Sequence, residues 1–134
     1  VYRRSGMFKP NSVILYVDNV ETSTAFYKSI FGEGPVEAFP GFSVFSLKDG
    51  FILGLQSKHD IEPKPQPAFG GFELCLSDIS IEEVDAIYRD FKARNIPMAL
   101  PPSRLEFGYT FVALDPDGHR IRLCATDTSG IEKL

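Results

Sequence analysis

The same pattern of apolar and polar residues occurs twice along this chain. A short apolar segment that ends in polar residues spans 13–20 and recurs at 72–79. Each copy is followed by a helical apolar pattern and then by an Asp-Gly pair between two apolar segments, Asp49-Gly50 in the first copy and Asp117-Gly118 in the second. Repetition of this kind indicates two copies of one supersecondary unit. We therefore expect an α+β fold built from two βαβββ modules.

Both helices are marked at their ends. Asn19 is placed to cap the first helix, which we expect to stop at Gly32. Ser80 and Glu83 have the spacing of a capping box at the start of the second helix. The other strands are predicted near 35–39, 42–47, 51–56, 98–101, 109–114 and 120–125.

The repeat also predicts the domain organisation. We expect a single domain, residues 1–134, with module one at about 12–58, a linker at about 59–68 and module two at about 69–126. Prolines at alternate positions, Pro63, Pro65 and Pro67, favour an extended linker. A module of this size is a small sheet with one face covered by a helix, so its other face needs cover from the second module or from another chain.

Composition excludes several partners. The net charge is -4 without a dense Lys/Arg cluster, so nucleic acid is not expected to bind. No apolar run approaches the roughly 20 residues of a membrane helix. Cys75 and Cys124 are too few for a disulfide scaffold and lie in apolar segments, where reduced thiols are usually buried. We expect a cytoplasmic protein.

Two segments carry a family resemblance: YVDNVETSTAFY (16–27, with Phe31-Gly32 after it) and DPDGHRIRL (115–123). They resemble the glyoxalase, bleomycin-resistance and extradiol-dioxygenase superfamily, the vicinal oxygen chelate proteins. The resemblance implies that two modules curl their sheets around a shared cavity, usually in a homodimer. It covers nearly the whole chain.

The same resemblance implies where a metal would bind. The family's metalloenzymes take one ligand from the first strand and one from the last strand of each module. Aligning the repeats by their turns and by their first strands places these positions at Ser12, Gly54, Gly71 (Phe72 if the register slips) and Arg122. None of them is a His, Asp or Glu, the donors that such metals need. We expect no metal and no other cofactor.

Strand alternation predicts which side chains face the cavity. If Gly54 and Arg122 face it, so do Ser12, Ile14, Tyr16, Ile52, Gln56, Glu73, Cys75, Arg120 and Cys124. Two-residue Asp-Gly turns would add Ser43, Phe45, Leu47, Tyr109, Phe111 and Ala113, whereas a longer turn would direct these six away. The residues predicted to bind a ligand are Ser12, Tyr16, Phe45, Gln56, Glu73, Tyr109, Phe111 and Arg122.

The family resemblance implies that the first and last strands of a module are neighbours, which would place Glu73 and Arg122 on one face of adjacent strands, and three interpretations of this pair stay open. In the first, the two side chains only neutralise one another. In the second, Arg122 binds a ligand carboxylate or phenolate, while Glu73 orients Arg122 or accepts a hydrogen bond from the ligand. In the third, Glu73 is a general base.

Within the family, the sequence is most similar to the metal-free branch of phenazine-type antibiotic resistance proteins. It departs from that branch in having no Trp, including near Gln56. We expect metal-independent binding and sequestration of a small aromatic or amphipathic molecule, with antibiotics among the candidates, and no catalysis.

Two other functions stay open. A metal-dependent lyase or dioxygenase, of glyoxalase lyase/isomerase type, would bring His59 or His119 to a carboxylate. A protein-association module would have a closed cavity.

Overall fold

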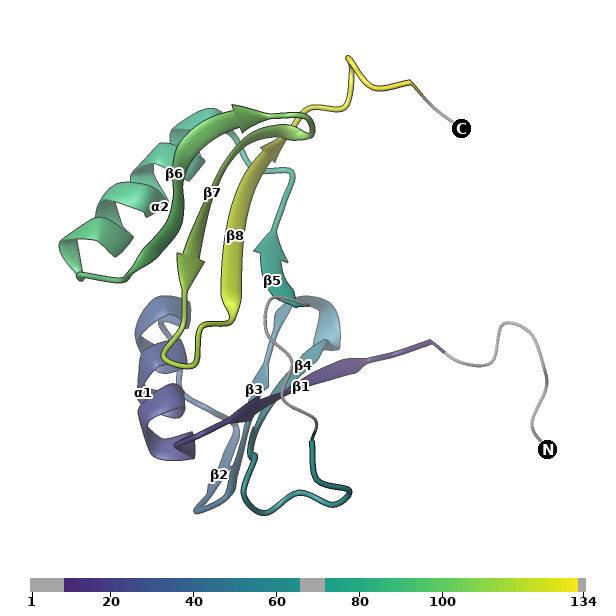
Figure 1. Cartoon of the computed structure of the whole chain (residues 1–134), viewed down its shortest axis with the longest axis vertical. Helices are drawn as coiled ribbons and strands as arrows, with labels where there is room; N and C mark the ends of the chain where they lie inside the picture. The colour runs from purple at the N-terminus through teal and green to yellow at the C-terminus, as the bar shows by residue number, and fades with distance from the viewer. Residues whose placement is uncertain (1–8, 66–71, 133–134) are drawn as a thin grey trace. The chain divides into compact units, whose positions relative to one another are not determined.

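A computed structural model describes residues 9–65 and 72–132. The chain falls into two compact units, Val1–Gln66 and Pro67–Leu134, and each unit holds one four-stranded sheet and one long helix. This is the α+β, two-module architecture that the repeat predicts (Figure 1). Two predicted features lie outside the described residues: the end of the linker, including Pro67, and the expected metal-ligand position Gly71.

The first unit is a mixed sheet in the order β1-β4-β3-β2. β1 and β4 are parallel, and the other two strand pairs are antiparallel. Its elements are β1 (Ser12–Val17), α1 (Val20–Phe31), β2 (Glu37–Phe39), β3 (Phe42–Ser46) and β4 (Ile52–Ser57), with a 3-10 turn at Lys48–Gly50.

The second unit repeats this topology as β5-β8-β7-β6, again with a parallel pair, β5 and β8. Its edge strand β6 runs through Pro101 and Pro102, which is longer than predicted; an edge strand tolerates proline because one side of it needs no ladder partner. The elements are β5 (Glu73–Leu76), α2 (Ile81–Ala93), β6 (Met98–Leu105), β7 (Gly108–Leu114) and β8 (Arg120–Thr126).

Local sequence fixes both ends of α1 and the start of α2 as predicted. The Asn19 side chain accepts a hydrogen bond from the Thr22 amide, and α1 ends at Gly32, whose φ of 76° suits glycine. Ser80 and Glu83 form the reciprocal capping box at the start of α2. Among the described residues, no helix is long and apolar enough to cross a membrane.

One face of each sheet packs against its helix. In the first unit, Phe31 of α1 meets Phe45 of β3 edge to face at 5.4 Å. In the second, Tyr88 and Phe91 of α2 both contact Phe111 of β7. Phe45 and Phe111 are almost fully buried, so the apolar core of each unit lies between helix and sheet.

The two hairpin loops each have one residue more than a two-residue turn. Leu47 pairs with Phe51 across Lys48–Gly50, and Asp115 pairs with His119 across residues 116–118. One extra residue reverses the inward and outward alternation of the strand before the loop. The prediction that Phe45, Tyr109 and Phe111 face the cavity is therefore wrong, and so is that for Ser43, Leu47 and Ala113. On β3 and β7, the residues that share the helix-free face are Phe42, Val44, Ser46, Gly108, Thr110, Val112 and Leu114.

The strand register also corrects the alignment of the two modules. Ile14 lies opposite Gly54, and Cys75 lies opposite Arg122. If Gly54 and Arg122 are equivalent, the counterpart of Ile14 is Cys75 rather than Glu73. The predicted alignment of first strands is thus displaced by two residues relative to the hairpins. A shift of two keeps every side chain on its predicted face.

Candidate functional site

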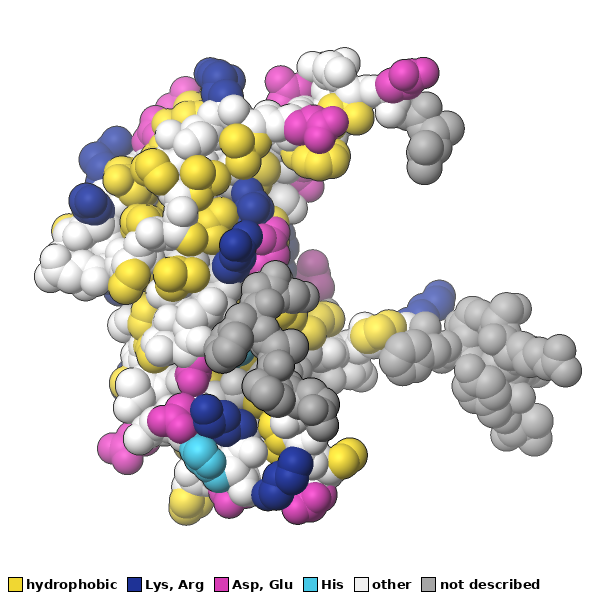
Figure 2. Space-filling model, viewed as in Figure 1, with side chains coloured by type: hydrophobic (Ala, Val, Ile, Leu, Met, Phe, Trp, Pro, Cys, Tyr) yellow, Lys and Arg dark blue, Asp and Glu magenta, His cyan; other side chains and the backbone are white. Residues whose placement is uncertain are grey.

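The helix-free face of the second sheet holds five residues that were predicted to face the cavity: Glu73, Cys75, Arg120, Arg122 and Cys124. Pairing of β5 with β8 places Glu73 beside Arg120 and Cys75 beside Arg122, while Cys124 and Thr110 continue the same face. Figure 2 shows cationic and acidic side chains next to one another over β5 and β8, bordered by hydrophobic ones. The predicted shared face of Glu73 and Arg122 is confirmed.

Arg122 is held by two hydrogen bonds. Its Nε donates to Glu73 Oε1 at 2.8 Å, and its Nη1 donates to Thr110 Oγ1 at 3.2 Å. Thr110 in turn donates to the Leu123 carbonyl at 2.6 Å and is buried. The side chains of Arg122 and Glu73 are only 22% and 36% exposed, so the ion pair is partly desolvated and its geometry is set by the sheet.

A hollow of about 580 Å³ opens over this ion pair. That volume lies within the range of roughly 300–1,000 Å³ typical of small-molecule sites. Arg122, Glu73 and Thr110 share its lining with Cys75 and Cys124 of the same sheet face. The other lining residues are Ser77, Asp78, Leu105, Glu106, Phe107, Gly108 and Thr126.

The β6–β7 turn supplies the apolar rim of the hollow. Leu105 and Phe107 are 49% and 58% exposed, which is unusual for large apolar side chains of a folded unit. Gly108 allows this turn to close on β8: its φ is 135°, and a Cβ there would lie 2.1 Å from the Ala125 carbonyl oxygen. The Asp127 amide then donates to the Phe107 carbonyl at 2.7 Å.

Cys75 is an exposed thiol on this face, and Cys124 is buried. Partial burial, followed by the nearby Glu73 carboxylate, raises the pKa of the Cys75 thiol. A thiol with a raised pKa is a weak nucleophile at neutral pH, so Cys75 suits contact with a ligand better than covalent chemistry. The prediction of two buried cysteines holds for Cys124 and is wrong for Cys75.

The helix-free face of the first sheet is mostly apolar. Ile14 and Tyr16 are 52% and 44% exposed there. The ring of Phe42 covers Gly54: a Cβ at Gly54 would lie 3.1 Å from Phe42 Cζ and 3.2 Å from Ile14 Cγ1. The register places Ser12 and Gln56 on the same face. Ligand binding by Ser12, Tyr16 and Gln56 stays a prediction.

The residues at the family's metal positions do not fit a metal. Ser12 and Gly54 offer no imidazole or carboxylate, and Gly54 lies under the Phe42 ring. Arg122 is a cation engaged with Glu73. With the corrected alignment of the modules, the counterpart of Ser12 is Glu73, a single carboxylate that is already paired with Arg122. These side chains cannot form the set of three or more donors that zinc or iron requires.

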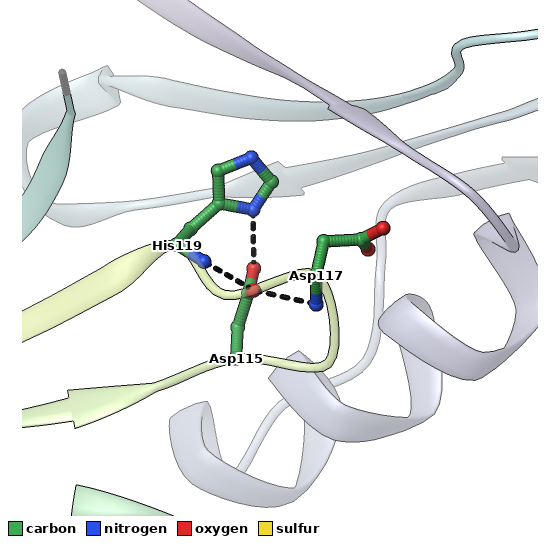
Figure 3. Close-up of side chains that lie close together, drawn as sticks. All are labelled: Asp115, Asp117 and His119. Atoms are coloured by element: carbon green, nitrogen blue, oxygen red, sulfur yellow. Dashed lines mark hydrogen bonds and ion pairs between the residues drawn. The ribbon is translucent and has the colours of Figure 1, made fainter. Parts of the chain in front are cut away.

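His119 lies in a different cluster, at the loop between β7 and β8. Among the described residues, Asp115, Asp117 and His119 are the group of three whose possible ligand atoms all lie within 4.8 Å of one another. The buried Asp115 carboxylate already accepts hydrogen bonds from the Asp117 amide, the His119 amide and His119 Nδ1 at 2.7–2.9 Å (Figure 3). These bonds brace the loop, and the bond from the imidazole ring to the Asp115 carboxylate raises the pKa of His119.

His59 also meets a carboxylate, as the metal-dependent alternative predicted for one of the two histidines. Its Nε2 lies 2.8 Å from Asp18 Oδ1 on an exposed surface of the first unit. This hydrogen bond, with Lys58 nearby, lowers the pKa of Asp18. Each histidine therefore forms a side-chain hydrogen bond with one aspartate: the His119 pair lies within one loop, and the His59 pair joins two segments of the first unit.

Sequence reasoning missed several residues of this site. Phe42 and Thr110 were overlooked because the expected turn length directed their strands the wrong way. The rim residues Leu105 and Phe107 gave no periodic signal, since they lie at a turn. Tyr109, predicted in the cavity, instead donates from its hydroxyl to Asp85 of α2 at 2.6 Å, and this hydrogen bond raises its pKa.

Comparison with known proteins gives consistent matches. A family model described as the Glyoxalase/Bleomycin resistance protein/Dioxygenase superfamily matches residues 9–123. Phenazine antibiotic resistance protein EhpR from Enterobacter agglomerans is 33% identical over 121 residues, which cover 88% of this chain and 92% of EhpR.

Two solved structures have a similar fold. The solution structure of protein ATC0852 from Agrobacterium tumefaciens is similar at 45% identity and a TM-score of 0.79, covering 90% of this chain and 99% of that protein. A glyoxalase/bleomycin resistance protein/dioxygenase from Nocardioides has a TM-score of 0.80 at 23% identity, covering 100% of this chain and 91% of its own, and supports the fold alone.

Proposed function

Because this chain belongs to the glyoxalase/bleomycin resistance protein/dioxygenase superfamily, we propose that it is a metal-independent member that binds and sequesters a small aromatic or amphipathic molecule. The role is of the resistance type, and the ligand is held rather than transformed. The similarity to an antibiotic resistance protein supports this role.

The observation that carries the proposal is the Arg122–Glu73 ion pair. In that pair, Arg122 stands at the last-strand position where the family's metalloenzymes would place a carboxylate ligand to the metal. A cation there repels a metal ion, and without a metal the family's isomerase and dioxygenase chemistry lacks its electrophile. The Phe42 ring over Gly54 gives the first module an equally unsuitable position.

The hollow over the ion pair supports binding as the remaining function. Large apolar side chains at its rim provide contact area, and a few polar groups at its base can fix the orientation of a ligand. A protein-association module with a closed cavity fits this arrangement less well. Binding is expected to be accompanied by homodimerisation, since exposed Ile14 and Tyr16 on a helix-free sheet face favour cover by a second copy.

Calorimetric titration with three phenazines tests the proposal: phenazine, phenazine-1-carboxylate and phenazine-1-carboxamide. We expect saturable binding of at least one, with the compound recovered chemically unchanged. Arg122→Leu should weaken that binding at least about tenfold, which is about 1.4 kcal/mol, because it removes donors from the base of the hollow. Arg89→Leu, on an exposed position of α2, is the matched control. Turnover of the compound, or full affinity in Arg122→Leu, would contradict the proposal.

A further inference from the structure

We propose that the hollow of the second unit selects uncharged aromatic ligands that carry a hydrogen-bond acceptor and donor on one edge, such as a primary carboxamide, over the matching carboxylates. This inference rests on the proposed binding function and specifies its ligand class. It depends on residues of the second unit alone.

Arg122 provides the donors. A guanidinium has five N–H groups, and the structure engages one on Nε with Glu73 and one on Nη1 with Thr110. Within residues 9–65 and 72–132, the other N–H groups of Arg122 have no acceptor. Arg122 lines the hollow, so a ligand carbonyl oxygen there can accept from these N–H groups.

Glu73 provides the acceptor. Its Oε1 accepts from Arg122, and no donor among the described residues reaches Oε2. The side chain is 36% exposed and lines the same hollow, so an N–H group of a ligand can donate to it. The ion pair therefore presents one donor side and one acceptor side, which match the C=O and N–H groups of a carboxamide.

Charge decides between the carboxamide and the carboxylate. Three carboxylates line the hollow, Glu73, Asp78 and Glu106, against one cation, Arg122. The charge of Arg122 is already offset by Glu73 at 2.8 Å. An anionic carboxylate ligand would accept hydrogen bonds from Arg122. It would also lie against the Glu73 carboxylate, and it has no N–H group to donate to Glu73. An uncharged ligand meets no such repulsion.

The test compares two compounds that differ mainly in charge, phenazine-1-carboxamide and phenazine-1-carboxylate, by calorimetric titration near neutral pH. The full chain should bind the carboxamide at least about tenfold more tightly. In Glu73→Gln, an amide of the same shape replaces the carboxylate, so the preference should fall to about threefold or less. Glu82→Gln, an exposed position of α2 outside the hollow, should keep the preference of the unmodified chain.

A second variant guards against a local effect of breaking the ion pair. Glu106→Gln removes a rim carboxylate that, among the described residues, is not one of the hydrogen-bond partners of Arg122, and it should also reduce the preference. Equal or tighter binding of the carboxylate by the unmodified chain, or a preference unchanged in both lining variants, would overturn this inference and leave the binding function standing. If neither compound nor phenazine binds, the proposed function fails, and this inference fails with it.

Discussion

Single residues determine which branch of the family this chain resembles. Arg122 is a cation at the position where the family resemblance leads us to expect a metal-binding carboxylate, and Thr110 and Glu73 hold that cation in place. Gly54 leaves room for the Phe42 ring, so the equivalent position of the first module is apolar. The sequence alone indicated that positions 54 and 122 carry no side chain that binds a metal. It could not indicate Phe42, because which face a residue of β3 occupies depends on the length of a loop.

His119 makes folding stability depend on pH. Its hydrogen bond to the buried Asp115 carboxylate raises its pKa above the usual 6.5. The protonated, paired form therefore contributes stability that is fully present below about pH 6.5 and is lost as the pH rises through the raised pKa of the folded state. The free energy of unfolding should fall more in His119→Asn than in the control His59→Asn, and the difference should be larger at about pH 5.5 than at about pH 8.5.

Urea unfolding of both variants at the two pH values measures this. His59 is the matched control because it also pairs with one aspartate, but its side chain is 60% exposed. An effect of His119→Asn that grows with pH would show that the Asp115–His119 bond does not stabilise the fold as described.

At the scale of elements, the order of strands and helices follows from the sequence, and both ends of α1 and the start of α2 were predicted to the residue. Asn19, Gly32 and the Ser80–Glu83 pair act locally, within one turn of backbone, so their effects can be predicted without tertiary structure. Loop length could not be predicted in this way. An Asp-Gly pair fits both two- and three-residue loops, and the structure adds Lys48 in one loop and Pro116 in the other. That single residue moved Phe45, Tyr109 and Phe111 to the helix-covered face.

A substitution at Gly108, in the β6–β7 hairpin, tests the described structure of the rim of the hollow. In Gly108→Ala the new Cβ would overlap the Ala125 carbonyl and approach the Asp127 amide at 2.8 Å, at a φ that suits glycine. We expect a loss of about 3 kcal/mol in the free energy of unfolding. Gly130→Ala is the matched control, because nothing lies within 4 Å of its added Cβ. Chemical denaturation that finds the two variants equally stable would contradict the described geometry.

At the scale of the whole molecule, two copies of one module have diverged in chemistry while keeping one topology. The helix-free face of the first sheet is largely apolar, with Ile14, Tyr16 and Phe42, and that of the second is polar around Arg122 and Glu73. Each face, taken by itself, therefore offers a ligand a different chemistry. Sequence predicted both faces in outline, since strand alternation survives a two-residue shift in alignment.

The most direct test of this account is to titrate the tightest-binding phenazine into protein stripped of metal with a chelator, and again after adding Zn²⁺, Ni²⁺, Fe²⁺ or Mn²⁺, with bound metal per chain measured alongside. The account predicts binding in the chelator with an affinity that changes by less than about twofold when metal is added, and no stoichiometric metal uptake. Binding that appears only once a metal occupies the protein would contradict it.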